Sequence, residues 1–458
     1  MLRSVALAAV MGVSSVLAVK CTLDSHCPES APCCGQYGDC GVGAFCLGGC
    51  DPRMSFSMDS CMAAPTCEDK TLRMNTVDNI QHISEYLGDA SKADWVASGE
   101  PVLYEDNVLL TMAEGTVGTV LSSTAYMWYG SVRARMRTSR GRGVVSAFIL
   151  FSDVKDEIDY EWVGVDLGTT QTNFYFQGIP DYDNSANISL SNTFSNFHDY
   201  EIRWTPDRIE WVVDGEVGRT QLRSDTWNSS AQQWDFPQTP SRVQLSLWPG
   251  GLATNAQGTI DWAGGEIDWA HEDVRNTGYF YAMVEEVEIK CWDGNGRLGS
   301  NDGHSYTYNS ARATNDTVEV GNARTNIASL TATGLDPDKG RPRPRPDNND
   351  DDDNNNDDDD DDEDEDQPNN SVPGGIILQP PRQPGDGENN ADGNGDNGGS
   401  SGNSGSRPTT DCPVGSFHLN CGEGESEASN TGGGDSGSSK ASASALAIII
   451  AGCALYWL

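Results

Sequence analysis

The spacing of hydrophobic residues between about residue 68 and residue 295 limits the fold of this chain more than any other feature. Short runs in which apolar and polar side chains alternate recur through this region, for example at 200–204, 209–213 and 243–248, and Gly, Pro, Asn or Asp separate them. Alternation with a period of two is typical of β-strands. Regularly spaced short strands predict an all-β sandwich or jelly roll, and about 230 residues are enough for one large core.

The two ends of the chain predict a secreted protein held by a lipid. Residues 1–18 combine an early base, an apolar run and small residues at the cleavage positions, as in a signal peptide. Residues 430–458 combine small residues, a polar spacer and a 14-residue apolar tail, the pattern of a GPI-anchor signal with Asn430 as the attachment residue. That tail is shorter than the roughly 20 residues needed to span a bilayer. We therefore expect a secreted protein, GPI-anchored on the outer face of the plasma membrane.

The formal net charge of −40 is concentrated in one segment. Residues 347–366 hold 15 acidic residues and five Asn, and removing them leaves −25. Because such a run repels itself, it predicts disorder. We expect a disordered acidic and Gly/Ser-rich stalk over 331–429, after a C-terminal extension over 296–330. The acidity also argues against nucleic acid as a partner, since binding to its backbone needs basic patches.

The cysteines predict a disulfide-rich module over residues 19–67. The chain has 13 cysteines, of which Cys453 leaves with the apolar tail, so 12 remain. Nine of these lie between Cys21 and Cys67, a density that suits an oxidising compartment. Two cysteines of the C-terminal tail can close a short loop, which leaves Cys291 to pair with one of the nine. The full connectivity does not follow from the sequence.

Sequons at Asn187, Asn228 and Asn315 predict N-glycosylation in the same compartment. The six His are scattered and form no metal triad. We expect no metal, no cofactor and a monomer.

The chemistry-bearing residues are concentrated in residues 156–162, which read DEIDYEW. Alternation on a strand places three apolar residues on one face and three acids on the other, namely Glu157, Asp159 and Glu161. Neighbouring carboxylates raise one another's pKa, and a protein that tolerates them usually uses them. The alternative is a solvated sheet face that carries defensive charges. Two carboxylates flanking a glycosidic bond are what glycoside hydrolysis requires.

The string DEIDYE resembles the E-I-D-x-E signature of family 16 of the glycoside hydrolases. That resemblance implies a concanavalin-like β-jelly-roll over 68–295, with Glu157 as nucleophile, Asp159 as helper and Glu161 as acid/base in a retaining reaction. The strings HDYEIRW at 198–204, LWPGG at 247–251 and GTIDWAGG at 258–265 are similar to the fungal Crh-type cell-wall transglycosylases. This subfamily resemblance implies transfer of chitin chains onto β-glucan in the cell wall.

Sugar contacts are expected on the polar face of residues 243–248, where Gln244, Ser246 and Trp248 alternate with apolar residues. The resemblance points to Gln244, Trp248 and Thr259 as substrate-binding residues. Thr259 and Asp261 are expected to share a strand face. Trp262 and Trp269 fit either the cleft or the core. Weaker candidates are Trp128, Asn173 and Tyr175. We expect three other residues in the core, namely Trp204, Trp211 and His198.

Residues 33–41, which read CCGQYGDCG, resemble the centre of hevein-like chitin-binding modules. That resemblance implies that Tyr37 and Phe45 stack on N-acetylglucosamine, although Gly35 replaces the usual Ser. The alternative is a disulfide cap that stabilises the catalytic domain. The Crh-type resemblance implies that Cys61 and Cys67 form a separate pair. The other disulfide candidates are Cys33, Cys34, Cys40 and Cys46.

Three hypotheses for function follow. The first is a retaining transglycosylase that cuts chitin and joins the fragment to β-glucan. The second is a chitin or β-glucan hydrolase without transfer, because the two reactions differ only in whether water or a sugar hydroxyl attacks the glycosyl-enzyme. The third is a non-catalytic, lectin-like wall adhesin, since folds of this kind host both enzymes and binders. The three acids favour an enzyme.

Overall fold

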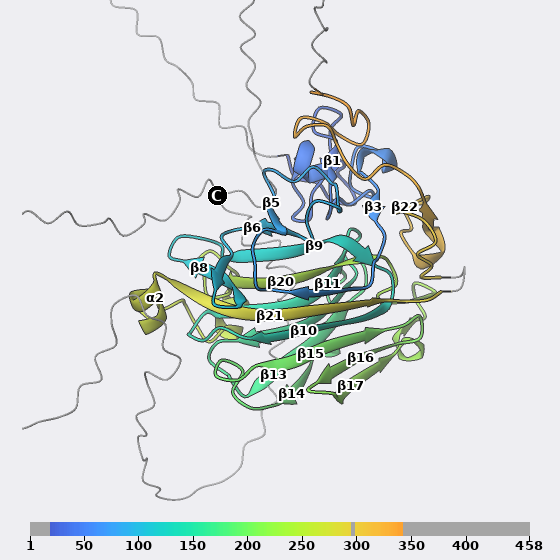
Figure 1. Cartoon of the computed structure of the whole chain (residues 1–458). Coiled ribbons are helices and arrows are strands. Elements are labelled where there is room, and N and C mark those ends of the chain that lie inside the picture. Colours follow the sequence, from blue (N-terminus) through green and yellow to red (C-terminus); the bar gives the residue numbers. More distant parts are fainter. Residues whose placement is uncertain (1–18, 295–297, 342–458) are drawn as a thin grey trace, which may run out of the picture.

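The computed structural model describes residues 19–294 and 298–341 (Figure 1). The predicted signal peptide, the GPI signal with Asn430 and the stalk beyond residue 341 lie outside the described residues. Those predictions remain predictions.

Two eight-stranded sheets pack face to face and form the body of the protein (Figure 1). In the first, sheet I, the strand order is β17-β16-β15-β10-β21-β8-β7, and β4 pairs with β21 beside β8. The strands of sheet I are β4 (Lys70–Arg73), β7 (Val102–Tyr104), β8 (Asn107–Ala113), β10 (Gly130–Arg137), β15 (His198–Trp204), β16 (Arg208–Val213), β17 (Glu216–Leu222) and β21 (Tyr279–Cys291).

In the second, sheet II, the strand order is β14-β13-β12-β11-β20-β9-β6-β5. Its strands are β5 (Ile80–His82), β6 (Trp95–Ser98), β9 (Thr119–Met127), β11 (Val144–Ser152), β12 (Glu157–Val163), β13 (Thr169–Tyr175), β14 (Ala186–Ser189) and β20 (Ser241–Pro249). All neighbours in this sheet are antiparallel except β5 and β6.

The core lies between the two sheets and is rich in aromatic side chains. Trp162 and Tyr160 from sheet II meet Tyr200 from sheet I, with ring centroids 4.5 Å and 5.6 Å from that tyrosine. Each large apolar side chain buried this way contributes roughly 1.5–3 kcal/mol. The predicted all-β sandwich is confirmed. Trp204, Trp211 and His198 are buried, as expected.

The remaining elements are short. The small sheets comprise β1 (Cys33–Cys34) with β2 (Cys40–Gly41), β18 (Trp227–Asn228) with β19 (Gln233–Trp234), and β3 (Ala64–Pro65) with β22 (Ser305–Tyr308) and β23 (Val318–Gly321). The described α-helices are α1 (Gln257–Trp262) and α2 (Glu272–Thr277), and the 3₁₀ turns are Gly43–Cys46, Met58–Ser60, Tyr182–Asn184, Arg223–Thr226 and Asn315–Thr317. None of the described helices is long and apolar enough to cross a membrane.

The expectation that Thr259 and Asp261 share a strand face is wrong. These residues belong to helix α1, in which residues two apart point in different directions. The Gly residues on both sides of this short segment gave no indication of the change from strand to helix.

Five disulfides join the ten cysteines of the described residues. Three close the Cys-rich module, Cys21–Cys34, Cys27–Cys40 and Cys33–Cys46. The other two are Cys50–Cys61 and Cys67–Cys291.

Cys291 therefore pairs with one of the nine N-terminal cysteines, as predicted, but the expected pair between Cys61 and Cys67 is wrong. Cys61 ends a turn inside the module, where it meets Cys50. Cys67 precedes β4, which pairs with the end of β21 and so brings Cys67 to Cys291.

The chain after β23 returns to the Cys-rich module (Figure 1). The Gly43 amide donates to the carbonyl of Ala332, and the Gly334 amide donates to the carbonyl of Ser60. Ala332 is fully buried. The prediction that a disordered stalk begins at residue 331 is thus wrong for 331–341. The small, polar composition of this segment gives no apolar pattern, and only its contacts with the module fix it.

Loss of the Cys67–Cys291 disulfide is expected to destabilise the sandwich strongly. The two bonded cysteines are 224 residues apart in the sequence. In the chain-entropy view, a disulfide that closes a loop of this size raises the free energy of unfolding by about 5 kcal/mol. We expect the double variant Cys67→Ser/Cys291→Ser to lower the free energy of unfolding by several kcal/mol in urea denaturation. The matched control is Cys21→Ser/Cys34→Ser, whose cysteines are 13 residues apart and for which about 3 kcal/mol is expected. An equal or larger effect of the control contradicts this prediction.

Candidate active site

Strand β12 presents the three predicted acids on one face. Glu157, Asp159 and Glu161 point to the outer face of sheet II, whereas the alternate residues, Ile158, Tyr160 and Trp162, belong to the core between the sheets. The acids keep only 5%, 1% and 6% of their surface exposed. The alternation inferred from the sequence is therefore what the structure shows.

The three carboxyls are held in an environment that disfavours charge. Burial, and then the neighbouring Asp159, raise the pKa of Glu157 well above its usual value, and Lys155 opposes that shift. Burial, then Asp159 and Glu157, raise the pKa of Glu161. Burial raises the pKa of Asp159 to about 7. Because neighbouring carboxyls of this kind titrate together, one member of the row can stay protonated and act as an acid while another is ionised.

Asp159, at the centre of the row, is held both through its own backbone and through a hydrogen bond between its carboxyl and the Asn173 backbone. The Trp211 indole N–H donates to the backbone carbonyl of Asp159 over 2.9 Å. The Oδ2 atom of Asp159 is buried and has no hydrogen-bond partner within the described part of the chain. Arg219 lowers the pKa of Asp159 from beneath the strand, against the effect of burial. Its guanidinium stacks over Trp211 at 4.3 Å.

The strands beside β12 extend the polar outer face. Asp159 lies opposite Asn173 on β13 and opposite Ile149 on β11, and Ile149 in turn lies opposite Gln244 on β20. Glu161 lies opposite Gln171. Gln244 and Asn173 thus share the face of the acids, two strands and one strand away. Tyr175 faces the same way, and its hydroxyl accepts from the Asn173 amide at 2.6 Å.

An aromatic pair lies at the Glu161 end of this face. Trp248 on β20 and Trp262 at the end of α1 stack with ring centroids 5.9 Å apart and planes 27° apart. The Trp262 indole N–H donates to Gln171, the residue opposite Glu161, over 2.8 Å. Both rings pack on the small apolar cluster that contains Val145, Val163 and Ala263. Trp262 therefore belongs to the site rather than to the central core.

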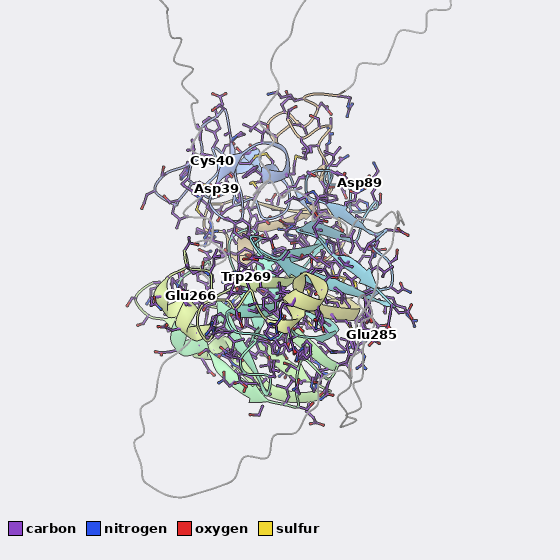
Figure 2. All side chains as sticks on the ribbon, turned by 90° about the vertical axis from the view of Figure 1, so that its left-hand side faces the viewer. Asp39, Cys40, Asp89, Glu266, Trp269 and Glu285 are labelled. Atoms are coloured by element: carbon purple, nitrogen blue, oxygen red, sulfur yellow. A yellow bond between two sulfur atoms is a disulfide. The ribbon has the colours of Figure 1, made fainter. Side chains whose placement is uncertain are left out.

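Three other predicted candidates are held by packing within the protein. Thr259 is fully buried in α1 and exposes no surface to a ligand. Trp128 belongs to the core, where its indole donates to the carbonyl of Gln238. Trp269 packs on Phe280 of sheet I, and Figure 2 shows it beside Glu266 in the segment that contains the helices. The abundance of Trp in the sequence does not show which Trp residues lie at the site and which lie in the core.

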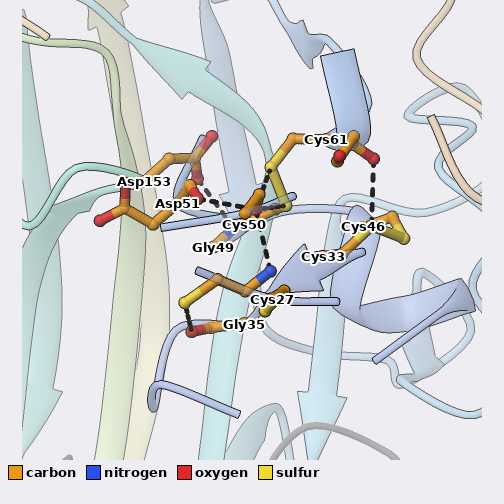
Figure 3. Close-up of a disulfide and its surroundings, with 12 residues drawn as sticks. Cys27, Cys33, Gly35, Cys46, Gly49, Cys50, Asp51, Cys61 and Asp153 are labelled. Carbon is orange, nitrogen blue, oxygen red and sulfur yellow. Dashed lines mark hydrogen bonds between the residues drawn. A yellow bond between two sulfur atoms is a disulfide. The ribbon is translucent and has the colours of Figure 1, made fainter. Parts of the chain in front are cut away.

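The Cys-rich module lies against the Glu157 end of the face, in keeping with the alternative of a cap on the catalytic domain. It contacts three consecutive residues that lead into β12. The Gly49 amide donates to Asp153 (Figure 3), the Arg53 guanidinium to the carbonyl of Val154, and the Lys155 ammonium to the carbonyl of Gln36, each over 2.8 Å. The turn before the first acid is thus held from the module side.

Asp156 anchors the same turn from the opposite direction. Its carboxylate accepts from the amides of Gln177, Gln238 and Thr239 and from the Thr239 hydroxyl, at 2.6–3.1 Å. Because every one of these donors is a protein group, Asp156 holds the backbone of the turn, and the chemistry is assigned to the three acids that follow.

The two module aromatics lie in different surroundings. Phe45 is 7% exposed and packs between Gly35 and Gly41, where an added Cβ on Gly41 would lie 2.3 Å from the ring. Phe45 is therefore part of the module interior and presents no free ring face. Burial raises the pKa of Tyr37, which lies with Gln36 against sheet II.

The predicted glycosylation residues differ in access. Asn187 on β14 is exposed. The side-chain amide of Asn228 donates to Asp235, and that of Asn315 donates to the Tyr129 hydroxyl. Asn187 has the most open position of the three.

Comparison with known proteins agrees with this geometry. Residues 89–264 match the family Glycosyl hydrolases family 16. The chain is 60% identical over 334 residues to Crh-like protein 3 of Botryotinia fuckeliana, an alignment that covers 73% of this chain and 75% of that protein. It is 52% identical over 324 residues to Crh-like protein 2 of Aspergillus fumigatus, covering 70% and 73%.

Among solved structures, the chain is similar to one described as Crh5 transglycosylase in complex with NAG. The identity is 27%, the TM-score is 0.47, and the match covers 57% of this chain and 97% of that one. The family match and the two high-identity relatives span the segment that carries β12 and its neighbours. The chain therefore belongs to family 16 of the glycosyl hydrolases and, within it, to the Crh-like proteins.

Proposed function

We propose that this protein is a retaining transglycosylase that cleaves chitin and transfers the fragment to β-glucan. The observation that carries the proposal is the row of three buried carboxyls on one face of β12, with a stacked Trp pair at one end. Three buried carboxyls with raised pKa values are typical of a catalytic site and are not required for sugar binding by a lectin.

The first half of the reaction forms a glycosyl-enzyme. The ionised carboxylate of Glu157 attacks the anomeric carbon of the donor sugar while the bond to the leaving oxygen breaks. Glu161, kept protonated by burial and by its acidic neighbours, gives its proton to that oxygen. Asp159 lies between them on the same face and shares in the titration of the row.

The second half transfers the sugar. Glu161 is now a carboxylate and takes the proton of an acceptor hydroxyl, whose oxygen attacks the anomeric carbon and releases Glu157. A glucan hydroxyl gives transfer, and water gives hydrolysis. The module contacts on the turn 153–155 hold Glu157 in place during both steps.

The proposed sugar contacts are Gln244, Trp248 and Trp262. The Trp rings offer apolar faces to sugar rings, and the polar face around Gln244 offers hydrogen-bonding groups. Thr259, expected as a further contact, exposes no surface and is left out of this set. We also propose that the protein is secreted and GPI-anchored, works as a monomer at the cell wall, and acts there without a metal or cofactor.

Replacement of the nucleophile is expected to abolish turnover. Incubated with chitin oligomers and labelled laminarin, the wild type should give a labelled product of higher mass. Glu157→Gln keeps the size of the side chain but cannot form the glycosyl-enzyme, so both transfer and release of reducing ends should fall at least 10³-fold, roughly as for loss of a nucleophile in other enzymes. Glu114→Gln is the matched control, because it makes the same exchange at an exposed residue outside the carboxyl row.

Two results of that experiment contradict the proposal. New reducing ends in the wild type without any labelled product of higher mass indicate a hydrolase. Turnover that survives in Glu157→Gln removes Glu157 from the role of nucleophile.

The site is expected to cost stability at alkaline pH. Burial raises the pKa of Asp159 to about 7 from an ordinary value of 3.8, so ionising it opposes folding, and this loss grows as the pH rises from about 4 to above 7. Asp159→Asn should therefore raise the melting temperature by several degrees at pH 8 and leave it unchanged at pH 3.5, while activity falls. Calorimetry at the two pH values checks this. A melting temperature that rises equally at both is the contrary outcome.

A further inference from the structure

The Cys-rich module turns its hevein-like loop toward the sugar face of sheet II. Gln36 and Tyr37, from the middle of that loop, lie with Arg242 in a small pocket between module and sheet. The module and sheet II approach each other closely, since an added Cβ on Gly48 would lie 2.6 Å from the Arg242 guanidinium. The sheet covers part of this loop, and residues 36–39 remain partly exposed.

Two carboxamides meet at this junction. The Gln244 amide donates to the Gln36 oxygen at 2.9 Å, and the Gln36 amide donates to the Gln244 oxygen at 3.2 Å. Arg242 also donates to the Gln36 oxygen, at 3.2 Å. Each carboxamide nitrogen carries two N–H groups, and the pair uses one from each. Within the described residues neither carboxamide nitrogen makes a second hydrogen bond, so each glutamine has one N–H that it can offer to a ligand carbonyl.

The pocket beside this pair combines apolar and polar walls. Val96 and Val120 from β6 and β9 provide apolar surface, and Ser98 and Ser122 from the same strands alternate with them. Tyr37 provides an aromatic wall from the module. A small group with a methyl end and an amide end matches such walls, because the methyl packs on the valines while the carbonyl accepts N–H bonds.

We propose that Gln36 and Gln244 together recognise the acetamido group of an N-acetylglucosamine unit in the donor chain. This inference rests on the proposed function and specifies how the enzyme selects chitin as donor. Gln244 lies two strands from Asp159, which is about 10 Å at the usual strand spacing. The recognised unit is therefore not the one that is cleaved but one further along the chain. The module acts as one wall of the donor groove.

The test compares Gln36→Leu with the wild type. Leucine keeps the bulk of glutamine and removes its hydrogen-bonding groups. We expect the KM for chitin oligomers to rise about 3- to 10-fold, the loss of one neutral hydrogen bond, with kcat and the KM for the laminarin acceptor unchanged. The matched control is Glu29→Ala, an exposed residue of the same module, which should change neither constant.

A second measurement separates recognition from packing. Chitin oligomers and their N-deacetylated counterparts are used as competitive inhibitors of donor binding. The wild type should bind the acetylated oligomers more tightly, and Gln36→Leu should lose that preference while its affinity for the deacetylated oligomers stays the same. Val120→Phe, which fills the pocket from the sheet side, should also raise the donor KM, and it replaces Gln36→Leu if that variant does not fold.

Failure of this inference is distinct from failure of the proposed function. Suppose that the wild type transfers sugar. Acetamido recognition by Gln36 is then overturned if Gln36→Leu leaves the donor KM unchanged, raises the acceptor KM equally, or lowers kcat alone. A wild type that transfers no sugar overturns the proposed function itself.

Discussion

Burial of one face of β12 between the sheets is the constraint on which the rest of the site depends. Ile158, Tyr160 and Trp162 fix the strand in the core, and their packing offsets the cost of three carboxyls on the opposite face. Tyr160 also donates through its hydroxyl to the carbonyl of Val212 in sheet I, over 3.0 Å. A strand held only by sheet hydrogen bonds would be free to twist its acids apart. Strand β12 is also held by the contacts of its apolar face with sheet I.

The row of buried carboxyls lowers the stability of the fold, and the turn beside it is held by many hydrogen bonds. Burial raises the pKa values of all three acids, and repulsion from Asp159 adds to this for Glu157 and Glu161, so each is kept at some expense of stability. The adjoining turn is held by hydrogen bonds, because Asp156 accepts four of them and Asp153 accepts from the Gly49 amide and the Tyr126 hydroxyl. Rigid neighbours thus support a destabilised centre, which is the usual arrangement of a catalytic site.

The Cys-rich module is part of this support rather than a separate attachment. It reaches the turn before Glu157 through Gly49, Arg53 and Gln36, and the chain end near Ala332 folds back over it. The alternative of a stabilising cap describes these contacts better than a free chitin-binding domain does. The catalytic sandwich, the module and the returning segment therefore form one unit, whose covalent closure is the Cys67–Cys291 bond.

The sequence by itself determined the sandwich, the strand β12 and the face of its acids, because a period of two in side-chain character leaves little choice when one face must be buried. It also placed Gln244 and Trp248 on one face. Arg242, on the same alternation, was within reach of that reasoning. Only the tertiary structure decided three further features: the helix at Thr259, the pairing of Cys61 with Cys50, and the contact of Gln36 with Gln244. The contact of Gln36 with Gln244 joins residues 208 positions apart, and no local pattern encodes such a long-range contact.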